Sequence, residues 1–482
     1  MLPGFIDTHG HLTALVNFDR YVNLSSPPAG PIRDIGELQA ALRRHITEQR
    51  IAPGEWVIGV GYDDSLLGEQ RHPTRDDLDA VSKDHPVWIV HVSGHLSAGN
   101  SVLLGLLGLS ADTADPIGGH FRRRVDSREL NGVFEEAAHY GVFARVPQPT
   151  TQALEAGIVR TLDRLAAYGL TTVQEGAANP AGMSLLQQAA AADRLDLDVI
   201  VYRSWSIVGS PFPDELPFGR YAGRLKIDGL KIILDGSPQG KTAYLSEPYF
   251  RSPEGRDAQY RGYPSLPQGA VDLAVRESLA RGVTLLAHAN GDAAAQMLID
   301  AVAAAPERSS DARVVMIHAQ TVRDDQLDRI AALHITPSFF IGHTFFWGDW
   351  HRDETLGPQR AQRISPLRSA TDRGIRYTLH NDPPVVPPDM IRTLWSATTR
   401  RTRSGVVLGA AQRASITEAL SAVTIDAARQ YGEADLKGSI EPGKQADFVI
   451  VSEDPLAMDP ERLLELRVLE TISRGRRVFP AD

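Results

Sequence analysis

The fold is decided by the stretch Pro3-Gly4-Phe5-Ile6-Asp7-Thr8-His9-Gly10-His11 near the start of the chain. Residues 5–9 are predicted to form a short strand that runs directly into the two histidines. Because side chains alternate along a strand, the imidazoles of His9 and His11 point the same way. Gly10 between them adds no bulk where two ligands approach one ion. The first strand therefore ends in a pair of candidate metal ligands.

Seven further β-branched runs follow this strand, and several come directly after stretches of helical periodicity such as 154–168 and 270–281. This alternation is typical of a parallel α/β sheet. Eight strands are the number that closes a (β/α)₈ TIM-type barrel, in which chemistry gathers at the carboxyl ends of the strands. The predicted strands are 5–9, 171–175, 197–202, 230–234, 283–288, 314–318, 335–340 and 375–380.

A large insertion, from about residue 12 to 150, separates the first two strands and carries strand-like runs at 56–60 and 87–92. An insertion at this place lies on the catalytic rim, where it would form a lid or a wall of the substrate site. The barrel with this inserted subdomain is expected to span residues 3–430.

The last part of the chain, residues 431–482, is expected to be a separate small β domain. A turn cluster at 438–444 precedes three strand-like runs, at 446–451, 468–473 and 477–479.

Composition excludes several classes of protein. The 482 residues contain 50 Lys and Arg against 60 Asp and Glu, and this acidic balance disfavours nonspecific binding to nucleic acid or to anionic membranes. No apolar run reaches the ~18 residues of a membrane span, and the N-terminus lacks the layout of a signal peptide, so a cytoplasmic protein is expected. With 0 cysteines, any metal must be bound by nitrogen and oxygen ligands. A homodimer is expected only because dimers are the commonest oligomers of soluble proteins.

Histidines recur at the ends of the predicted strands. His288 ends the fifth strand, His318 ends the sixth, and the eighth runs into His380-Asn381-Asp382. Any one of them, His318 for example, is most simply a core histidine bonded to backbone. As a set they favour metal binding, because histidines with one carboxylate are the ligands that Zn²⁺ and its neighbours prefer when thiols are absent.

Lys231 lies inside the apolar fourth strand. Burial should lower the pKa of its amine and make it nucleophilic. One outcome is capture of CO₂ as a carbamate, an anion that can bridge two cations. The alternative is an ion pair of Lys231 with Asp235 or Asp228, and the sequence does not decide between the two.

The chain resembles the amidohydrolase superfamily, and specifically the amidohydrolase-3 branch that includes N-substituted formamide deformylases. The order and spacing of the matching pieces make the resemblance specific. The matching segments are 3–11, 61–64, 94–95, 100–101, 169–173, 235–237, 242–243, 288–292, 318–320, 382–385 and 438–447.

The resemblance implies a metal-dependent hydrolase that cleaves a non-peptide C–N bond of an N-formyl or N-acyl amide. It implies a divalent metal, Zn²⁺ first, as one or two ions, and a small β-sandwich beside the barrel built partly from the C-terminal strands. The implied metal ligands are His9, His11, His288, His318 and Asp382, with Lys231 at the position that many members carboxylate.

Two features depart from the family pattern. Relatives usually have several dozen residues before the Pro-Gly-Phe-Ile-Asp motif, which here begins at residue 3. Either the start has been misplaced or the sandwich is reduced. The end of the eighth strand also differs, because His380-Asn381-Asp382 stands where many relatives have Gly-Ser-Asp, so His380 adds a polar group beside the ligand.

Two catalytic residues are expected. Asp382 should orient the metal-bound water, take its proton and deliver it to the leaving amine. A histidine can hydrogen-bond the tetrahedral oxyanion. His95, in the insertion, is a candidate for that role or for substrate binding, and the alternative is a histidine on the lid surface. Glu175 ends the second strand, where a capping or ion-pair role competes with one in the site.

The substrate pocket is expected to use the aromatic loop 341–350 after the seventh strand, with His343 and Trp347, and Tyr62 from the insertion. Pockets are mostly apolar with few polar anchors, which suits this loop. The alternative is simple packing of a long rim loop. For the whole protein, two other functions compete with a small-molecule amidase: a cyclic amidase or deaminase on the same scaffold, and a catalytically inactive interaction scaffold.

Overall fold

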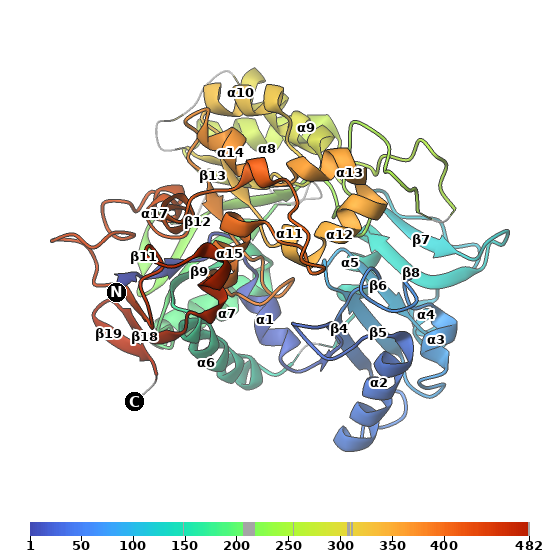
Figure 1. The fold of residues 1–482 in the computed structure, drawn as a ribbon. Helices are drawn as coiled ribbons and strands as arrows, with labels where there is room; N and C mark the ends of the chain where they lie inside the picture. The colour runs from blue at the N-terminus through green and yellow to red at the C-terminus, as the bar shows by residue number, and fades with distance from the viewer. Residues whose placement is uncertain (148, 206–216, 254, 306–308, 310–311, 481–482) are drawn as a thin grey trace.

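A nine-stranded sheet forms the centre of the computed structural model, which describes residues 1–147, 149–205, 217–253, 255–305, 309 and 312–480 (Figure 1). The short strand β11 (Tyr221–Ala222) is antiparallel to its neighbour, and the other eight strands are parallel. Their order in the sheet follows their order in the chain, and helices lie between most of them, as in a TIM-type barrel. All eight predicted strands are confirmed, with ends that differ by a few residues. The strands are β2 (Phe5–Ile6), β9 (Leu170–Ala178), β10 (Asp198–Ser204), β12 (Leu225–Ile233), β13 (Thr284–Ala289), β14 (Val314–His318), β15 (Thr336–Phe339) and β16 (Thr378–Leu379).

The first and last strands of this sheet, β2 and β16, meet along a line that we call the seam. Among the described residues no ladder of strand hydrogen bonds joins them. Instead, the residues that follow them bond to each other: the amide of Asp382 donates to His9 O at 3.0 Å and the amide of His11 donates to Pro383 O at 2.8 Å. The hydroxyl of Thr8 also donates to Leu379 O at 3.3 Å. The barrel is therefore closed by loop and side-chain contacts.

Alternation along the strands separates two cores. In β10, Val199 and Val201 pack outward against the helices, whereas Ile200 and Tyr202 point into the barrel. The predicted helices 154–168 and 270–281 are confirmed as α6 and α8. The helices around the barrel are α6 (Thr151–Ala167), α7 (Pro180–Ala191), α8 (Gln268–Ala280), α9 (Asp292–Ala304), α10 (Asp324–Ala332), α14 (Leu367–Thr371), α15 (Met390–Thr399), α16 (Ile416–Ala422) and α17 (Ile425–Gln430).

A six-stranded mixed sheet is built between β2 and β9 of the barrel, with the order β3-β4-β5-β6-β8-β7. Its two faces carry separate apolar cores. Both strand-like runs predicted for the insertion are present, as β4 and β5. The elements are α1 (Leu12–Phe18), β3 (Val22–Asn23), α2 (Ile35–Gln49), β4 (Val57–Tyr62), α3 (Arg75–Asp79), β5 (Val87–His91), β6 (Leu96–Gly99), α4 (Ser101–Leu107), β7 (Gly119–Arg123), β8 (Leu130–Glu136) and α5 (Ala137–Phe143).

Two short helices join this sheet to the barrel. They are α11 (His343–Phe346) and α12 (Gly348–Trp350), which follow β15 and lie beside the six-stranded sheet in Figure 1. The indole N–H of Trp347 donates to Asp63 Oδ2 at 2.6 Å, and Val92 packs against the apolar cluster that contains Phe340 and Trp347. The rim of the barrel and the insertion therefore share a packed boundary.

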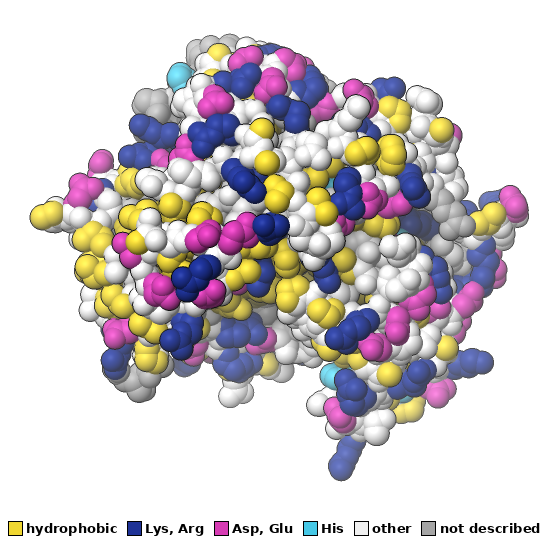
Figure 2. Space-filling model, in the orientation of Figure 1, with side chains coloured by type: hydrophobic (Ala, Val, Ile, Leu, Met, Phe, Trp, Pro, Cys, Tyr) yellow, Lys and Arg dark blue, Asp and Glu magenta, His cyan; other side chains and the backbone are white. Residues whose placement is uncertain are grey.

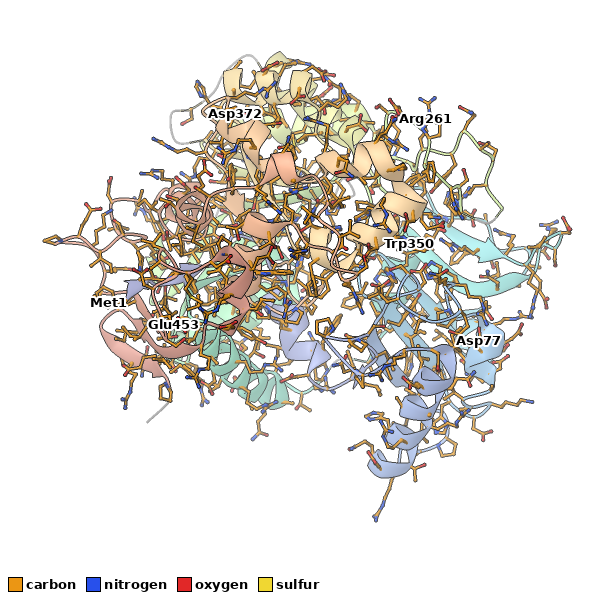
Figure 3. The ribbon with its side chains drawn as sticks, in the orientation of Figure 1. Met1, Asp77, Arg261, Trp350, Asp372 and Glu453 are labelled. Atoms are coloured by element: carbon orange, nitrogen blue, oxygen red, sulfur yellow. The ribbon has the colours of Figure 1, made fainter. Side chains whose placement is uncertain are left out.

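A four-stranded antiparallel sheet contains both ends of the described chain. The three strand-like runs predicted for the C-terminal region are present, and the two-residue strand β1 adds to them by pairing Leu2 with Val449 and Pro3 with Phe448. In Figure 3, Met1 and Glu453 lie on the same side of the molecule. The sheet consists of β1 (Leu2–Pro3), β17 (Phe448–Val451), β18 (Val468–Ser473) and β19 (Arg476–Phe479).

On the face shown in Figure 2, lysine and arginine side chains alternate with acidic ones among scattered apolar groups. Within the described ranges, no helix combines the length and the apolar character needed to cross a bilayer.

Candidate metal centre

His9 and His11 converge on Asp382 across the seam. Their ring centroids are 5.1 Å apart, and their Nε2 atoms lie 3.6 Å and 3.3 Å from Asp382 Oδ1. One ligand atom from each of these three residues lies within 4.8 Å of the others. Asp382 Oδ1 is buried and has no hydrogen-bond partner. A buried carboxylate oxygen without a donor is costly, which fits an oxygen that faces a cation.

Gly10 between the two histidines has a different neighbour from the one expected. A Cβ at this position would lie 2.9 Å from Cγ and Cδ of Pro383, which follows the aspartate. The close approach that requires glycine is therefore the packing of the first strand against the loop after the last strand. It brings His9 and His11 to Asp382, but the group it avoids is a proline ring.

His288 and His318 occupy the adjacent side of the centre. His318 Nε2 lies 3.1 Å from His288 Nδ1 and 3.8 Å from Asp382 Oδ2. Strand alternation in β14 directs Val315 and Ile317 into the barrel and would direct His318 outward. The left-handed backbone of His318, with φ 74°, breaks the alternation, and its ring lies inside.

Lys231 joins this group as well. Its Nζ lies 2.9 Å from His9 Nε2, and burial lowers the pKa of Lys231 to about 7. The fall in pKa that the sequence predicts is therefore confirmed. The two proposed ion-pair partners are used elsewhere: Asp228 lies 2.9 Å from Lys226, and Asp235 accepts backbone amides, including that of Asn290 at 3.0 Å.

The electrostatics favour neutral imidazoles. Burial is the main cause that lowers the pKa of His9, His288 and His318 well below the usual 6.5, and the nearby Lys231 amine acts in the same direction. A neutral imidazole is the form that ligates metals. Together with the aspartate, these donors suit a divalent metal ion of the zinc type.

Gln174 orients His9 and is a residue that the sequence did not single out. Its Oε1 accepts the Nδ1–H of His9 at 2.7 Å, which leaves Nε2 facing the centre. Its amide nitrogen donates to Thr8 O at 2.7 Å and to the Tyr431 hydroxyl at 3.0 Å. The sequence signal that could have identified Gln174 was a side-chain amide next to Glu175 at the end of a β-branched strand. Gly176 supports the arrangement, because a Cβ there would lie 2.5 Å from His9 Cε1.

His380 supports His318 in the same way. Its Nε2 lies 3.1 Å from His318 Nδ1, and its Nδ1 lies 2.8 Å from the Ser338 hydroxyl. Burial lowers the pKa of His380 to about 3, so this ring is neutral. His380, which departs from the family pattern, thus helps to orient His318.

Glu175 takes the capping role that the sequence left open. Its Oε2 accepts from the amide and the hydroxyl of Thr13, at 2.7 Å and 2.6 Å, in the first turn of α1. Its Oε1 lies 3.9 Å from His11 Nδ1. The carboxylate therefore anchors the segment that carries His11.

His95 is buried and lies beside the centre, so it is not a histidine on the surface of a lid. Its ring centroid is 5.0 Å from that of His288, and its Nδ1 lies 2.8 Å from Glu136 Oε2. Burial opposes protonation of His95, but the Glu136 carboxylate outweighs it, so the pKa of His95 is raised. Glu136 was not among the predicted residues, because nothing local in the sequence links it to His95.

The three residues predicted to bind substrate are all buried. His343 Nδ1 lies 3.0 Å from His351 Nε2, and its ring lies 4.7 Å from Phe340, which in turn lies 5.3 Å from His380. The Trp347 indole belongs to the same aromatic group. Tyr62 lies further away, in the core of the six-stranded sheet.

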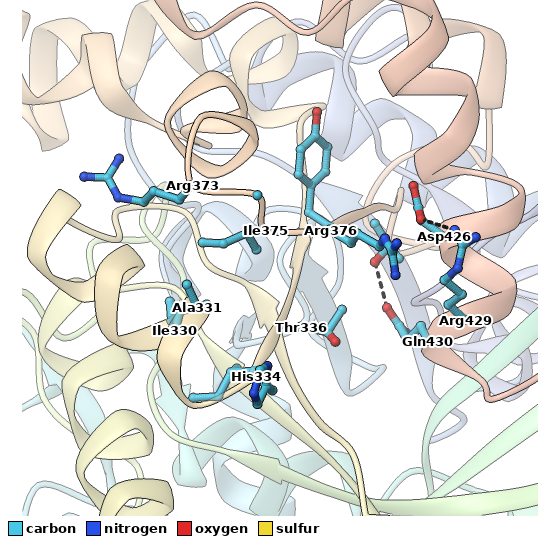
Figure 4. A pocket seen from close by; sticks show the side chains of 14 residues that line it. Ile330, Ala331, His334, Thr336, Arg373, Ile375, Arg376, Asp426, Arg429 and Gln430 are labelled. Atoms are coloured by element: carbon cyan, nitrogen blue, oxygen red, sulfur yellow. Dashed lines mark hydrogen bonds and ion pairs between the residues drawn. The ribbon is translucent and has the colours of Figure 1, made fainter.

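A cavity of about 460 Å³ lies at the opposite end of β15 and β16 from these histidines, lined by Thr336, Arg376 and Gln430 among others (Figure 4). Its Arg429 pairs with Asp426 at 2.6 Å. Because barrel enzymes carry their chemistry at the carboxyl ends of the strands, the histidine cluster rather than this cavity is the candidate functional site.

The family follows from sequence and geometry together. The chain belongs to the amidohydrolase family, which it matches over residues 1–479. It is accordingly a hydrolase that acts on carbon–nitrogen bonds of a small-molecule substrate.

Particular relatives agree with this assignment. The chain is 29% identical to an N-substituted formamide deformylase of Arthrobacter pascens, over 98% of this chain and 87% of that protein. It is 26% identical to the putative amidohydrolase YtcJ of Bacillus subtilis, over 99% and 89%. Among solved structures, an uncharacterized metal-dependent hydrolase from Pyrococcus horikoshii is similar, with a TM-score of 0.71 at 25% identity, over 95% of this chain and 87% of that one.

Proposed function

We propose that this protein hydrolyses the C–N bond of a non-peptide N-formyl or N-acyl amide by a metal-dependent mechanism. The observation that carries the proposal is the buried Asp382 Oδ1, which has no hydrogen-bond donor and faces the Nε2 atoms of His9 and His11. The name of the Arthrobacter pascens relative, an N-substituted formamide deformylase, supports the substrate class.

The metal would be held in two adjacent places. His9, His11 and Asp382 surround the first, and His288 and His318 lie beside the second. A carbamate formed on Lys231, whose Nζ lies 2.9 Å from His9 Nε2, would add an anionic oxygen ligand and would allow two ions, most simply Zn²⁺. Bound divalent metal supplies hydroxide at neutral pH, because coordination lowers the pKa of water from 15.7 to about 7.

Asp382 is the proposed general base. The carboxylate oxygen that does not face the metal would accept a proton from the attacking water and return it to the nitrogen of the leaving amine. The carboxylate is fixed for this role by the left-handed backbone at Asp382 (φ 56°) and by the hydrogen bond from its amide to His9 O. Both features lie at the seam, so the packing of the seam positions the proposed base as well as the proposed metal ligands.

His95 is proposed to stabilise the oxyanion. Glu136 accepts at Nδ1 and leaves Nε2 for the substrate, and the raised pKa of His95 favours a ring that donates there. A donor aimed at the developing oxyanion is worth about 10²–10³ in kcat. His343 and Trp347 are proposed to form the apolar wall of the pocket, with Tyr62 contributing from the insertion.

We further propose three units: a barrel over 3–430, its inserted subdomain over 12–150, and a β-sandwich portion over 431–482 that supplies β17, β18 and β19 of the four-stranded sheet, to which β1 is added from the start of the chain. A cytoplasmic location and a homodimer complete the proposal. Fractionation of cells and light scattering of the purified protein test these two points.

The function itself is tested by a substrate screen. Protein of known metal content is incubated with N-formyl, N-acyl and cyclic amides, with and without a chelator. We expect turnover of an N-formyl or N-acyl amide that the chelator abolishes and Zn²⁺ restores. Turnover of cyclic amides alone would replace the proposal with a cyclic amidase, and no turnover by fully loaded protein would favour a scaffold.

A further inference from the structure

A second group of metal-binding side chains lies in the six-stranded sheet, away from the barrel strands. Asp63 and Asp64 directly follow β4, and His91 is the last residue of the neighbouring parallel strand β5. One ligand atom from each lies within 4.8 Å of the other two, and all three residues are buried. The carboxyl ends of parallel strands bring them to one edge, as the barrel does for its own histidines.

Two atoms of this group lack the hydrogen bonds that their burial requires. The side chain of His91 is 0% exposed, and its Nε2 lies 2.9 Å from Asp64 Oδ1. Neither of these two atoms has a hydrogen-bond partner of acceptable geometry. The 2.9 Å separation is that of an ion pair and is shorter than the roughly 3.3 Å between two ligands of one tetrahedral ion with bonds of about 2.0–2.2 Å, so the two atoms would move slightly apart around a bound cation. Asp382 Oδ1 in the barrel shows the same combination of burial, nearby imidazole and missing donor.

Two cations lie near the group. Arg122 is bound to Glu135, and Arg403 interacts electrostatically with Asp63. His72 Nε2 lies 3.5 Å from Asp64 Oδ2, and its Nδ1 lies 3.1 Å from the Tyr62 hydroxyl. Two adjacent buried carboxylates and an imidazole therefore share this edge, and carboxylate oxygens with an imidazole nitrogen are a donor set that suits a divalent cation.

The surroundings already orient these donors. The Ser93 hydroxyl lies 2.8 Å from His91 Nδ1, and the Ser93 amide donates to the same nitrogen at 3.2 Å, so the ring proton stands on Nε2, which faces Asp64. A cation bound at Nε2 would move this proton to Nδ1, where the Ser93 hydroxyl can accept it. The amide and the hydroxyl of Ser65 donate to Asp63 Oδ1 at 3.0 Å and 2.6 Å. Such outer contacts are characteristic of ligands held in place for a metal.

We propose that Asp64, His91 and Asp63 form a second divalent-cation site of the zinc type in the inserted sheet, separate from the barrel centre, with His72 available as a further ligand.

The site would reach the substrate pocket through one contact. Asp63 Oδ2 accepts the indole N–H of Trp347 at 2.6 Å, and Trp347 packs on Phe340, whose ring lies 6.1 Å from that of His318. A cation that fixes Asp63 would therefore fix the aromatic wall of the pocket to the insertion. Its role is positioning, because none of its donors touches the barrel ligands.

The test is metal content, measured by elemental analysis of the purified full chain after loading with Zn²⁺ and removal of excess metal. We expect His91→Gln and Asp64→Asn each to lose one equivalent per chain relative to wild type. His85→Gln is the matched control, because His85 is a buried histidine of the same region bound to Ser82 and to a backbone carbonyl, and it should lose none.

Wild-type metal content in both variants, with circular dichroism that shows a folded chain, would overturn the proposal and leave His91 and Asp64 as an ion pair. If the variants do not fold, release of Zn²⁺ from wild type to a coloured chelator decides instead. A His9→Ala/His11→Ala variant should still release one slowly exchanging equivalent, and complete absence of bound metal there would refute the second site. Failure of the barrel function would appear separately, as loss of turnover without this change in stoichiometry.

Discussion

Asp382 is the residue on which the proposed chemistry depends most directly. Replacing it by asparagine keeps the shape of the side chain but removes the base, so kcat should fall by about 10²–10⁴ while the metal content stays largely intact. The measurement is kcat together with elemental analysis. Asp389→Asn is a control, since Asp389 caps α15 in the same loop and should retain activity. Undiminished kcat in Asp382→Asn would reject the role.

Lys231 gives the metal-free protein a dependence of stability on pH. Burial lowers its pKa in the folded state from 10.5 to about 7, so between these values the unfolded chain binds more protons than the folded one. The free energy of unfolding should therefore rise with pH in this window, by up to about 1.4 kcal/mol per pH unit.

The check is urea unfolding of wild type and Lys231→Met from pH 7 to 10, in the presence of chelator. The difference in unfolding free energy between the two proteins should shift in favour of wild type as pH rises. Two curves that stay parallel over this range would show that the amine titrates normally.

At the level of single residues, the sequence predicted the histidines and the aspartate of the barrel cluster because each lies at or just after the end of a strand, and parallel strands end at one face. Lys231 was predicted from its place inside an apolar strand. Strand alternation alone does not explain the position of His318, because its ring points into the barrel only through a backbone φ of 74°, which no local sequence pattern predicts. Gln174 and Glu136 were missed for a related reason. Each acts on a histidine distant in the chain, and only the fold brings the pairs together.

At the level of elements, the link between α11, α12 and the insertion rests on the hydrogen bond from Trp347 to Asp63. Trp347→Phe leaves Asp63 Oδ2 buried without this donor and should lower the free energy of unfolding by about 1–3 kcal/mol. Trp350→Phe is the matched control, because its indole donates to the Gln239 carbonyl at 3.1 Å in a half-buried place. Chemical denaturation measures both, and equal small losses would contradict the special place of Trp347.

Elements differed in how far they could be predicted. The barrel strands carry β-branched runs next to amphipathic helices, and all were found. Strands β3, β6, β7 and β8 were not predicted, because they are short or polar, as Leu96–Gly99 illustrates, and gain their stability from neighbours in the sheet. The strand β1 has only two residues, and its partner β17 lies near the other end of the chain.

At the level of the whole molecule, the seam is the least regular part of the barrel. Its proposed metal ligands come from both sides, His9 and His11 from one and Asp382 from the other, so a bound ion would hold the edges together. Removing metal should therefore raise amide exchange in Phe5–Ile6 and Thr378–Leu379 more than in Thr284–Ala289. Hydrogen exchange followed by mass spectrometry, with and without chelator, measures this, and uniform acceleration over all three segments would contradict it.

The seam also orders events during synthesis. The groups that meet there, such as Thr8 and Thr378, are 370 positions apart in the chain, and contacts at such separation form late because a long loop must close first. Synthesis would have to pass residue 382 of 482 before the aspartate could join the two histidines made at the start of the chain. The metal site would thus form late in folding, and a chain whose synthesis stops midway would have the ligands of the first strand without the aspartate and would be inactive.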